Sequence, residues 1–173
     1  MDDFDWPWEY NFPPFFTIQL HGKTKELQLS VWTNLVLKYF RHHRESQYTI
    51  GDEIVLFSNQ QIQRKLSNDG ILLILEELEK SGNAAPVDKK RLQWEIYWHP
   101  LDEWGNIIYQ WASDNGMTNT VCTLYEISQG ESSANEEFFG LDQSVLVKAL
   151  KTLQAKQKCE LMSFDDNEGV KFF

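Results

Sequence analysis

The chain has 173 residues, of which 42% are hydrophobic and 14% aromatic, and its formal net charge at pH 7 is −10. This composition excludes a disordered chain, because enough apolar surface is present to offset the entropy cost of folding. The negative charge repels a nucleic-acid backbone and an anionic lipid surface alike, so we expect the main partner to be a protein.

The two cysteines, Cys122 and Cys159, lie far apart in the sequence and form no CxxC pair. That usage is typical of buried thiols in a reducing compartment. The first residues are acidic and aromatic, and no apolar run approaches the roughly 20 residues of a membrane span. We therefore expect a cytoplasmic protein with no signal peptide and no transmembrane segment.

An eight-residue pattern occurs twice, first at 32–39 and again 72 positions later at 104–111. Both copies open with Trp, have Asn two positions on, and end on an aromatic residue. The same offset brings Ile74, Leu75 and Leu78 onto Leu146, Val147 and Leu150. Two copies are too few for a solenoid, so the repeat predicts two similar small domains in tandem.

The N-terminal strap, which we define as residues 1–22, is rich in aromatic residues: Phe4, Trp6, Trp8, Tyr10, Phe12, Phe15 and Phe16. Pro7, Pro13 and Pro14 disfavour a helix and favour extended or polyproline II backbone. Two alternatives remain open for these aromatic side chains. They pack over the first domain as a lid, or Pro13-Pro14-Phe15-Phe16 forms a hook for another protein.

The rest of the first half carries helical and then alternating patterns. We predict a helix over 25–44, a short strand at 48–50, a short helix at 59–66, and a third helix from Ser67 to Gly82. Asn68 or Asp69 is expected to cap that third helix. Alternation from Val87 to Trp98 predicts a hairpin that turns at 88–90.

The second half repeats this order in fewer residues after Pro100. We predict helices at 102–113, 123–129 and 143–157, the last capped by Asp142, with a strand at 119–122 and an acidic loop at 130–137. Segments 159–164 and 170–173 would form the closing hairpin, turning at 165–169. The fold class is therefore α+β: two tandem winged-helix domains, 23–99 and 100–173, preceded by an extended proline- and aromatic-rich strap at 1–22.

No motif in the sequence indicates catalysis. Gly22-Lys23-Thr24 resembles the end of a phosphate-binding loop, but Thr17 stands where that loop needs glycine. The four histidines lack metal-ligand spacing, and the acidic run at 165–169 is too short for a calcium loop. We expect no enzyme activity, no metal and no cofactor.

A winged helix raises nucleic acid as a possible ligand, because its third helix can enter the major groove. In the first domain that helix carries Glu76, Glu77 and Glu79 with only Lys80 to oppose them. The second domain has a small basic run: Lys148, Lys151, Lys156 and Lys158. A winged-helix nucleic-acid-binding or transcription-associated factor therefore stays as an alternative.

Several tryptophan-rich motifs carry a family resemblance that spans essentially the whole chain. They are Trp6-Pro7-Trp8 through Phe12-Pro13-Pro14-Phe15-Phe16-Thr17, Glu103-Trp104-Gly105 with Ile108-Tyr109-Gln110-Trp111, Thr123-Leu124-Tyr125-Glu126, Gly140-Leu141-Asp142 and Gly169-Val170-Lys171-Phe172-Phe173. Together they resemble the smallest subunit of the endosomal sorting complex ESCRT-II. The resemblance implies two tandem winged helices and no catalysis.

The resemblance also implies partners. Two copies of such a subunit attach to a core of the two larger ESCRT-II subunits, and membrane contact is made by the partners. The hook Pro13, Pro14, Phe15 and Phe16 would dock on the winged helices of those subunits, with Trp6 and Trp8 as supporting contacts. The subunit would act at the endosomal membrane, in sorting ubiquitinated cargo into multivesicular bodies.

The second winged helix would receive the N-terminal helix of an ESCRT-III subunit. No motif marks that surface, and we take the third-helix face with Lys148 and Lys151 as its candidate. A competing hypothesis is an adaptor whose Pro13-Pro14-Phe15-Phe16 segment binds a WW-type domain. Such a ligand normally has Tyr where Phe16 stands, which counts against it.

Overall fold

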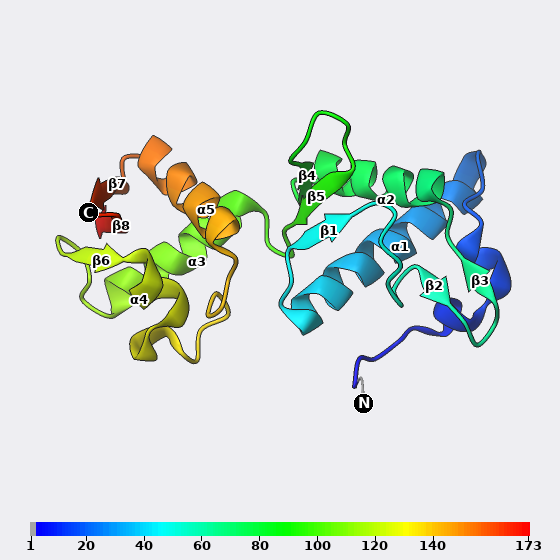
Figure 1. Cartoon of the computed structure of the whole chain (residues 1–173), viewed down its shortest axis with the longest axis horizontal. Helices are drawn as coiled ribbons and strands as arrows, with labels where there is room; N and C mark the ends of the chain where they lie inside the picture. The colour runs from blue at the N-terminus through cyan, green and yellow to red at the C-terminus, as the bar shows by residue number, and fades with distance from the viewer. Residues whose placement is uncertain (1–2) are drawn as a thin grey trace. The chain divides into compact units, whose positions relative to one another are not determined.

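The computed structural model describes residues 3–173, which form two compact units, one ending at Trp98 and the other running from His99 to Phe173 (Figure 1). Each unit has a long helix, a short strand, a later helix that packs on the first, and a closing hairpin. The α+β class and the two winged-helix units are therefore confirmed. The repeat that predicted them corresponds to the packed helix pair of each unit.

The first unit begins with two single turns of 3-10 helix, η1 (Trp8–Asn11) and η2 (Pro13–Phe16). There follow α1 (Gly22–His43), β1 (Gln47–Thr49), β2 (Ser58–Asn59), β3 (Arg64–Lys65), α2 (Asn68–Lys80), β4 (Ala84–Pro86) and β5 (Gln93–Ile96). An antiparallel sheet has the order β1-β5-β4, and β2 pairs with β3 as a separate hairpin. The β4–β5 hairpin is the wing of this unit.

The core of the first unit forms where α1 crosses α2. Trp32 and Val36 of α1 are fully buried, as are Ile74 and Leu75 of α2. Apolar residues three and four positions apart share one face of a helix, so these stripes meet when the helices pack.

One predicted element of the first unit is wrong. Residues 59–66, expected to be a short helix, instead include the β2–β3 hairpin. Gln63 at the turn has a φ of 52°, and the Asn59 side chain accepts a hydrogen bond from the Gln61 backbone N–H at 3.1 Å. These local bonds and the left-handed residue end the helical path.

The second unit contains α3 (Leu101–Asp114), β6 (Val121–Thr123), α4 (Leu124–Gln129), η3 (Glu131–Ser133), α5 (Gln143–Ala155), β7 (Cys159–Phe164) and β8 (Asn167–Phe172). Its antiparallel sheet has the order β6-β8-β7. The two helices α3 and α5 meet closely at Gly105, where a Cβ atom would lie 2.6 Å from Thr152 Oγ1 and 3.0 Å from the Ala149 carbonyl oxygen. Only glycine fits that contact without displacing a neighbour.

Three helices begin at a side chain that accepts a backbone N–H. Thr123 caps α4 at 3.0 Å and Asp142 caps α5 at 2.9 Å, both as predicted. The cap of α2 is Ser67, whose hydroxyl accepts the Gly70 N–H at 3.1 Å. The predicted cap at Asn68 or Asp69 is therefore wrong, because both residues already lie inside the helix.

The closing hairpin is longer than predicted. β8 begins at Asn167 instead of 170, because Asp165 and Asp166, with φ values of 47° and 62°, make the whole turn. Two successive residues at positive φ are typical of a type I′ turn, whose twist matches that of the flanking strands.

Within residues 3–173, no helix combines the length and the apolar character required to cross a membrane. The same residues contain no group of three or more His, Cys, Asp or Glu side chains arranged to hold a metal ion.

Candidate partner-binding site

The strap is not a continuous extended segment. Pro7, Phe12 and Thr17 have extended backbone, but the residues between them form the turns η1 and η2. Pro13 is the first residue of η2, where a missing N–H costs nothing and the fixed φ suits the helix. The predicted extended conformation is thus correct only at the joints of the strap.

The second turn packs into the core of the first unit. The ring of Phe15 stacks flat on Trp32, with 4.2 Å between ring centroids and 2° between planes. Trp32 Nε1 donates a hydrogen bond to the Phe15 carbonyl oxygen at 2.9 Å. Phe15 and Phe16 are only 4% and 3% exposed, so both rings belong to the core.

A glutamine of α1 holds the strap from one side. Gln28 Nε2 donates to the carbonyl oxygens of Pro14 at 3.3 Å and Thr17 at 3.2 Å. Its Oε1 accepts the Gln19 N–H at 2.8 Å. One side chain therefore satisfies three backbone groups that irregular backbone would otherwise leave to water.

Tyr10 holds the strap from the other side. Its ring stacks on Trp6 at 3.9 Å, its hydroxyl donates to the Val55 carbonyl oxygen, and its own carbonyl accepts from Asn59 Nδ2 at 2.8 Å. Burial raises the pKa of Tyr10 to about 12. A groove of about 610 Å³ runs beside it, between the strap and residues 53–61.

Four neighbouring apolar residues of the strap are exposed or half-buried, and we name them the aromatic edge: Trp8, Phe12, Pro13 and Pro14. Trp8 is 71% exposed and Phe12 is 48% exposed, with 5.6 Å between their ring centroids. Pro14 is exposed and Pro13 half-buried. Exposed aromatic residues grouped on a rigid backbone are typical of a protein-binding surface.

The predicted hook needs correction in one respect. Its binding role stays a prediction, but the rings of Phe15 and Phe16 do not face solvent, because Trp32 and the core cover them. Of the predicted site residues of the strap, Trp8 and Pro14 are exposed, and Trp6 and Pro13 are half-buried. A buried Phe16 also disfavours the WW-ligand hypothesis, since that position would have to be read from outside.

Phe12 was missed by the sequence reasoning. The sequence signal that could have revealed Phe12 is its spacing of four residues from Trp8. Across a helical turn such as η1, this spacing places two side chains next to each other. In the second unit the exposed Tyr125, 71% accessible, was also missed. It lines a groove of about 590 Å³ with the start of α5 and the β7–β8 turn.

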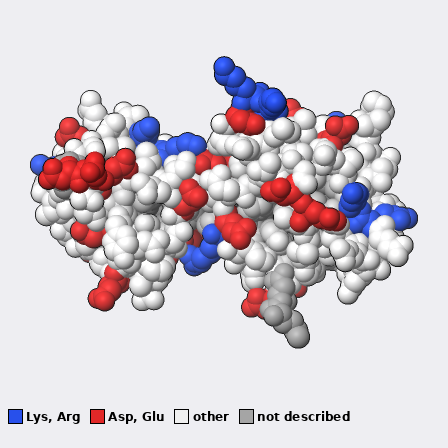
Figure 2. Space-filling view, viewed as in Figure 1, with Lys and Arg blue, Asp and Glu red and all other residues white. Residues whose placement is uncertain are grey.

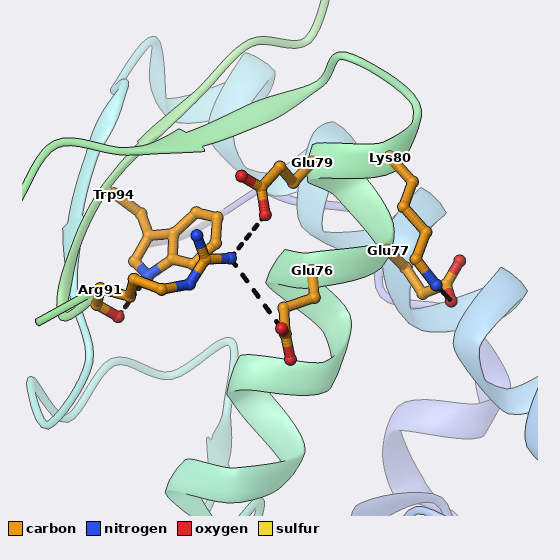
Figure 3. A network of polar contacts seen from close by, with 6 residues as sticks. All are labelled: Glu76, Glu77, Glu79, Lys80, Arg91 and Trp94. Carbon is orange, nitrogen blue, oxygen red and sulfur yellow. Dashed lines mark hydrogen bonds and ion pairs between the residues drawn. The ribbon is translucent and has the colours of Figure 1, made fainter. Parts of the chain in front are cut away.

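Helix α2, which the sequence predicted as the third helix of the first unit, does not present a surface for DNA. Arg91 of the wing lies 2.5 Å from Glu79 Oε1 and 3.9 Å from Glu76 Oε2, and its guanidinium lies over the Trp94 ring at 5.1 Å (Figure 3). Trp94 Nε1 donates to the Arg91 carbonyl oxygen at 2.8 Å. Arg91 and Lys80 therefore pair with carboxylates of α2, and neither cation is left to contact phosphate.

In the second unit, Lys148 and Lys151 lie three residues apart on α5 and thus on neighbouring positions of one helix face. Lys148 is half-buried and Lys151 exposed. Their role in binding an ESCRT-III helix stays a prediction.

The family model for an ESCRT-II complex subunit matches residues 9–142 of this chain. The chain belongs to the ESCRT-II complex subunit family. Vacuolar protein-sorting-associated protein 25 of Drosophila melanogaster is 51% identical over 174 residues, with 100% of both chains covered. The human protein of the same name is 46% identical, with 98% of each chain covered.

Solved structures agree with the family. The crystal structure of subunit VPS25 of the endosomal trafficking complex ESCRT-II matches with a TM-score of 0.87 and 29% identity, covering 96% of this chain and 98% of that one. A VPS22/VPS25/VPS36 structure of ESCRT-II matches with a TM-score of 0.82 and 30% identity, with the same shares covered. The predicted family, its role in endosomal vacuolar protein sorting and its non-catalytic character are confirmed.

Proposed function

We propose that this chain joins VPS22 and VPS36 in an ESCRT-II complex, in two copies, and links that core to an ESCRT-III subunit. The likeness to VPS25 within the solved VPS22/VPS25/VPS36 complex supports the first part. In this role the chain contributes to sorting ubiquitinated cargo into multivesicular bodies. Because its net charge is −10, contact with the endosomal membrane is made through its partners.

The attachment surface is the aromatic edge. The observation that carries this proposal is the exposure of Trp8 and Phe12, 71% and 48%, on a strap fixed by Gln28, Tyr10 and Trp32. A backbone already held in place loses little entropy on binding. Burying each ring would contribute about 1.5–3 kcal/mol.

Phe15 and Phe16 take a supporting role. By filling the space between the strap and Trp32, they hold Pro13 and Pro14 at the surface. Shortening either ring would loosen the turn η2 and weaken binding through misplacement of the edge, although neither ring touches the partner.

Calorimetry with the VPS22–VPS36 pair of the same organism tests the attachment surface. We expect Trp8→Ala/Phe12→Ala to weaken binding about 100-fold or more, because it removes two exposed rings of the kind that dominate interfaces. Tyr125→Ala is the matched control, since Tyr125 is as exposed as Trp8 at 71% but lies in the second unit. Unchanged binding of the double variant, in a chain that keeps its circular dichroism spectrum, would remove the proposal.

The ESCRT-III surface is tested separately. We expect Lys148→Glu/Lys151→Glu to weaken binding of a peptide covering the N-terminal helix of an ESCRT-III subunit, because α5 would lose its basic face. Lys89→Glu/Lys90→Glu makes the same charge change on the exposed wing turn of the first unit and serves as control. Equal effects of the two variants would show that only net charge matters.

A further inference from the structure

One serine of the chain closely follows two adjacent basic residues. Arg64 and Lys65 form β3, and Ser67 stands three positions after the arginine and two after the lysine. No other Ser or Thr in the sequence has a basic residue at both of these positions. Protein kinases that select basic substrates use carboxylates to bind cations placed two and three residues before the acceptor hydroxyl. The pattern therefore indicates a phosphorylation site.

Both cations are available to such an enzyme. Arg64 and Lys65 are exposed, and Figure 2 shows basic side chains gathered over the β2–β3 hairpin labelled in Figure 1. Arg91 and Lys80, in the same unit, have carboxylate partners at 2.5 Å and 3.2 Å. Within residues 3–173, by contrast, neither Arg64 nor Lys65 forms an ion pair. A carboxylate-lined cleft can thus bind them without first breaking a salt bridge.

The acceptor hydroxyl is accessible as well. Ser67 is exposed, and its Oγ accepts the Gly70 N–H at 3.1 Å as the cap of α2. Among the described residues, this hydroxyl donates to no other group, so its proton is available for transfer. Leu66, between the cations and the serine, is only 4% exposed. The segment therefore presents the residues that a kinase recognises and buries the one between them.

The backbone of residues 64–67 is extended, as a kinase substrate must be. β3 is a strand of a two-stranded sheet, so only one of its edges is paired with another strand, and Ser67 has a φ of −67° and a ψ of 158°. The first turn of α2 then contains three poor helix formers: Asn68, Asp69 and Gly70. A kinase that binds the segment therefore needs to open only this weak first turn.

We infer that Ser67 is a phosphorylation site for a serine/threonine kinase that recognises basic residues. The γ-phosphoryl group of MgATP passes to Ser67 Oγ. The Oγ–P bond forms, the bond from the γ-phosphorus to the bridging oxygen breaks to leave ADP, and the hydroxyl proton goes to the catalytic aspartate of the kinase. The phosphate carries about −1.5 to −2 charges at pH 7, so it offsets the positive charge of Arg64 and Lys65.

Neighbouring carboxylates argue against a simpler explanation, in which the start of α2 binds a free phosphate ion. Lys65 and Ser67 line a hollow of about 290 Å³ together with Asp52 and Glu53, and all four residues are exposed. These carboxylates, with Asp69 in the first turn of α2, repel a dissolved anion. A covalent Oγ–P bond does not depend on that local potential. The site is therefore one for modification and not for anion binding.

The test incubates the folded full chain with MgATP and the catalytic subunit of cyclic-AMP-dependent protein kinase, which selects basic substrates. Mass spectrometry of the intact chain and of its peptides counts and locates the phosphate. We expect a single phosphate group, on Ser67. Arg64→Gln/Lys65→Gln should lower the initial rate about tenfold or more, because each charge-assisted hydrogen bond to a kinase carboxylate contributes roughly a factor of ten.

Two serine variants complete the experiment. Ser67→Asn removes the acceptor hydroxyl and keeps the fold, since asparagine caps a helix about as well as serine. Ser81→Ala is the matched control, because Ser81 is an exposed serine at the other end of α2 and follows Glu79 and Lys80 instead of two cations. We expect Ser67→Asn to abolish phosphate incorporation and Ser81→Ala to leave it unchanged. Circular dichroism checks that each variant is folded.

Three results would overturn the inference. Unchanged incorporation in Ser67→Asn would show that another residue is the acceptor. Absence of incorporation, or incorporation only in urea, would show that the folded chain does not present the segment to a kinase. An unchanged rate in Arg64→Gln/Lys65→Gln would show that the two cations do not select the site.

Discussion

The two units carry the same helix pair but pack it differently. In the first unit α1 and α2 leave a groove of about 480 Å³ between them, whose lining includes Thr33 and Glu77. In the second unit α3 and α5 close on each other at Gly105, which occupies the position that Thr33 holds in the repeat. The residue that follows the repeated tryptophan is therefore glycine where the helices are in close contact and threonine where they border a groove.

The repeated tryptophans are also covered differently. Both Trp32 and Trp104 are completely buried. Trp32 is covered by the stacked ring of Phe15 from the strap, whereas Trp104 meets His99 edge-on at 4.8 Å. His99 in turn lies 2.9 Å from Glu137. The first unit thus uses an added segment as its cover, and the second unit uses residues of its own.

Truncating the tryptophans should have the largest effect. We expect Trp32→Ala and Trp104→Ala each to lower the free energy of unfolding by about 3–5 kcal/mol, because each leaves a large cavity. Trp32→Ala also removes the donor to the Phe15 carbonyl and should release the strap, so it alone should reduce binding to VPS22–VPS36. Loss of binding in both variants would contradict the conclusion that only Trp32 holds the strap in place.

Thiol labelling assigns each effect to its unit. Cys122 and Cys159 are free, buried and both in the second unit, and burial raises the pKa of Cys159 from 9.0 to about 11. The native thiols should therefore react slowly, through opening of that unit. Trp104→Ala should accelerate labelling and Trp32→Ala should not.

A side chain at Gly105 should have the next largest effect. We expect Gly105→Val to destabilise the second unit by about 1–3 kcal/mol, since it forces α3 and α5 apart. Thr33→Val is the matched control, because the first unit has open space at that position, and its cost should stay below about 1 kcal/mol. Denaturant titration of both variants checks the contrast, which fails if the two costs are equal.

High pH should affect the units in different ranges. Burial raises the pKa of Tyr10 and Tyr48 from 10.0 to about 12 in the first unit, and that of Cys159 from 9.0 to about 11 in the second. A raised folded-state pKa favours the neutral form, so its contribution is complete below the unfolded-state pKa and is lost as pH rises through the folded-state pKa.

The second unit should therefore lose stability from pH 9.0 to about 11, and the first from pH 10.0 to about 12, by on the order of 1 kcal/mol per group. In a chain that carries Tyr109→Phe and Tyr125→Phe, tyrosinate absorbance follows the first unit and thiol labelling the second in one titration. A single coincident transition below pH 9 would refute the assignment.

The smallest effect is expected for the contact between Glu137 and His99, the residue that packs on Trp104. Glu137→Gln removes the charge beside His99, and because both side chains are partly exposed the cost should remain below about 1 kcal/mol. Faster labelling of Cys122 and Cys159, with no change in binding to VPS22–VPS36, is the expected pattern. An effect as large as that of Trp104→Ala would show that the contact between His99 and Glu137, not the tryptophan ring, holds the unit together.

The sequence predicted correctly those helices and caps that depend on residues close together in the chain. The helices around Trp32 and Trp104, and the caps at Thr123 and Asp142, follow from spacing alone. The β2–β3 hairpin was missed because no glycine marks its turn, where Gln63 has a positive φ, and because Asn59 also bonds to Tyr10, 49 residues away.

At the candidate site, too, the sequence predicted local features but not those that depend on distant residues. The strap was recognisable from its prolines and aromatic residues, but which rings face outward depends on Trp32, which stacks on Phe15. In the same way, β3 packs against η2, and no local pattern encodes that contact.

The order of synthesis gives the strap a further property. Tyr10 needs Val55 and Asn59, which lie 45 and 49 residues later, before its hydrogen bonds can form. At roughly 5–20 residues per second, the ribosome takes several seconds to make that stretch. During this interval the aromatic residues of the nascent strap have no core to cover, so the strap folds well after it is made. A chaperone that shields aromatic residues on the emerging chain would act on the strap until Val55 and Asn59 have been made.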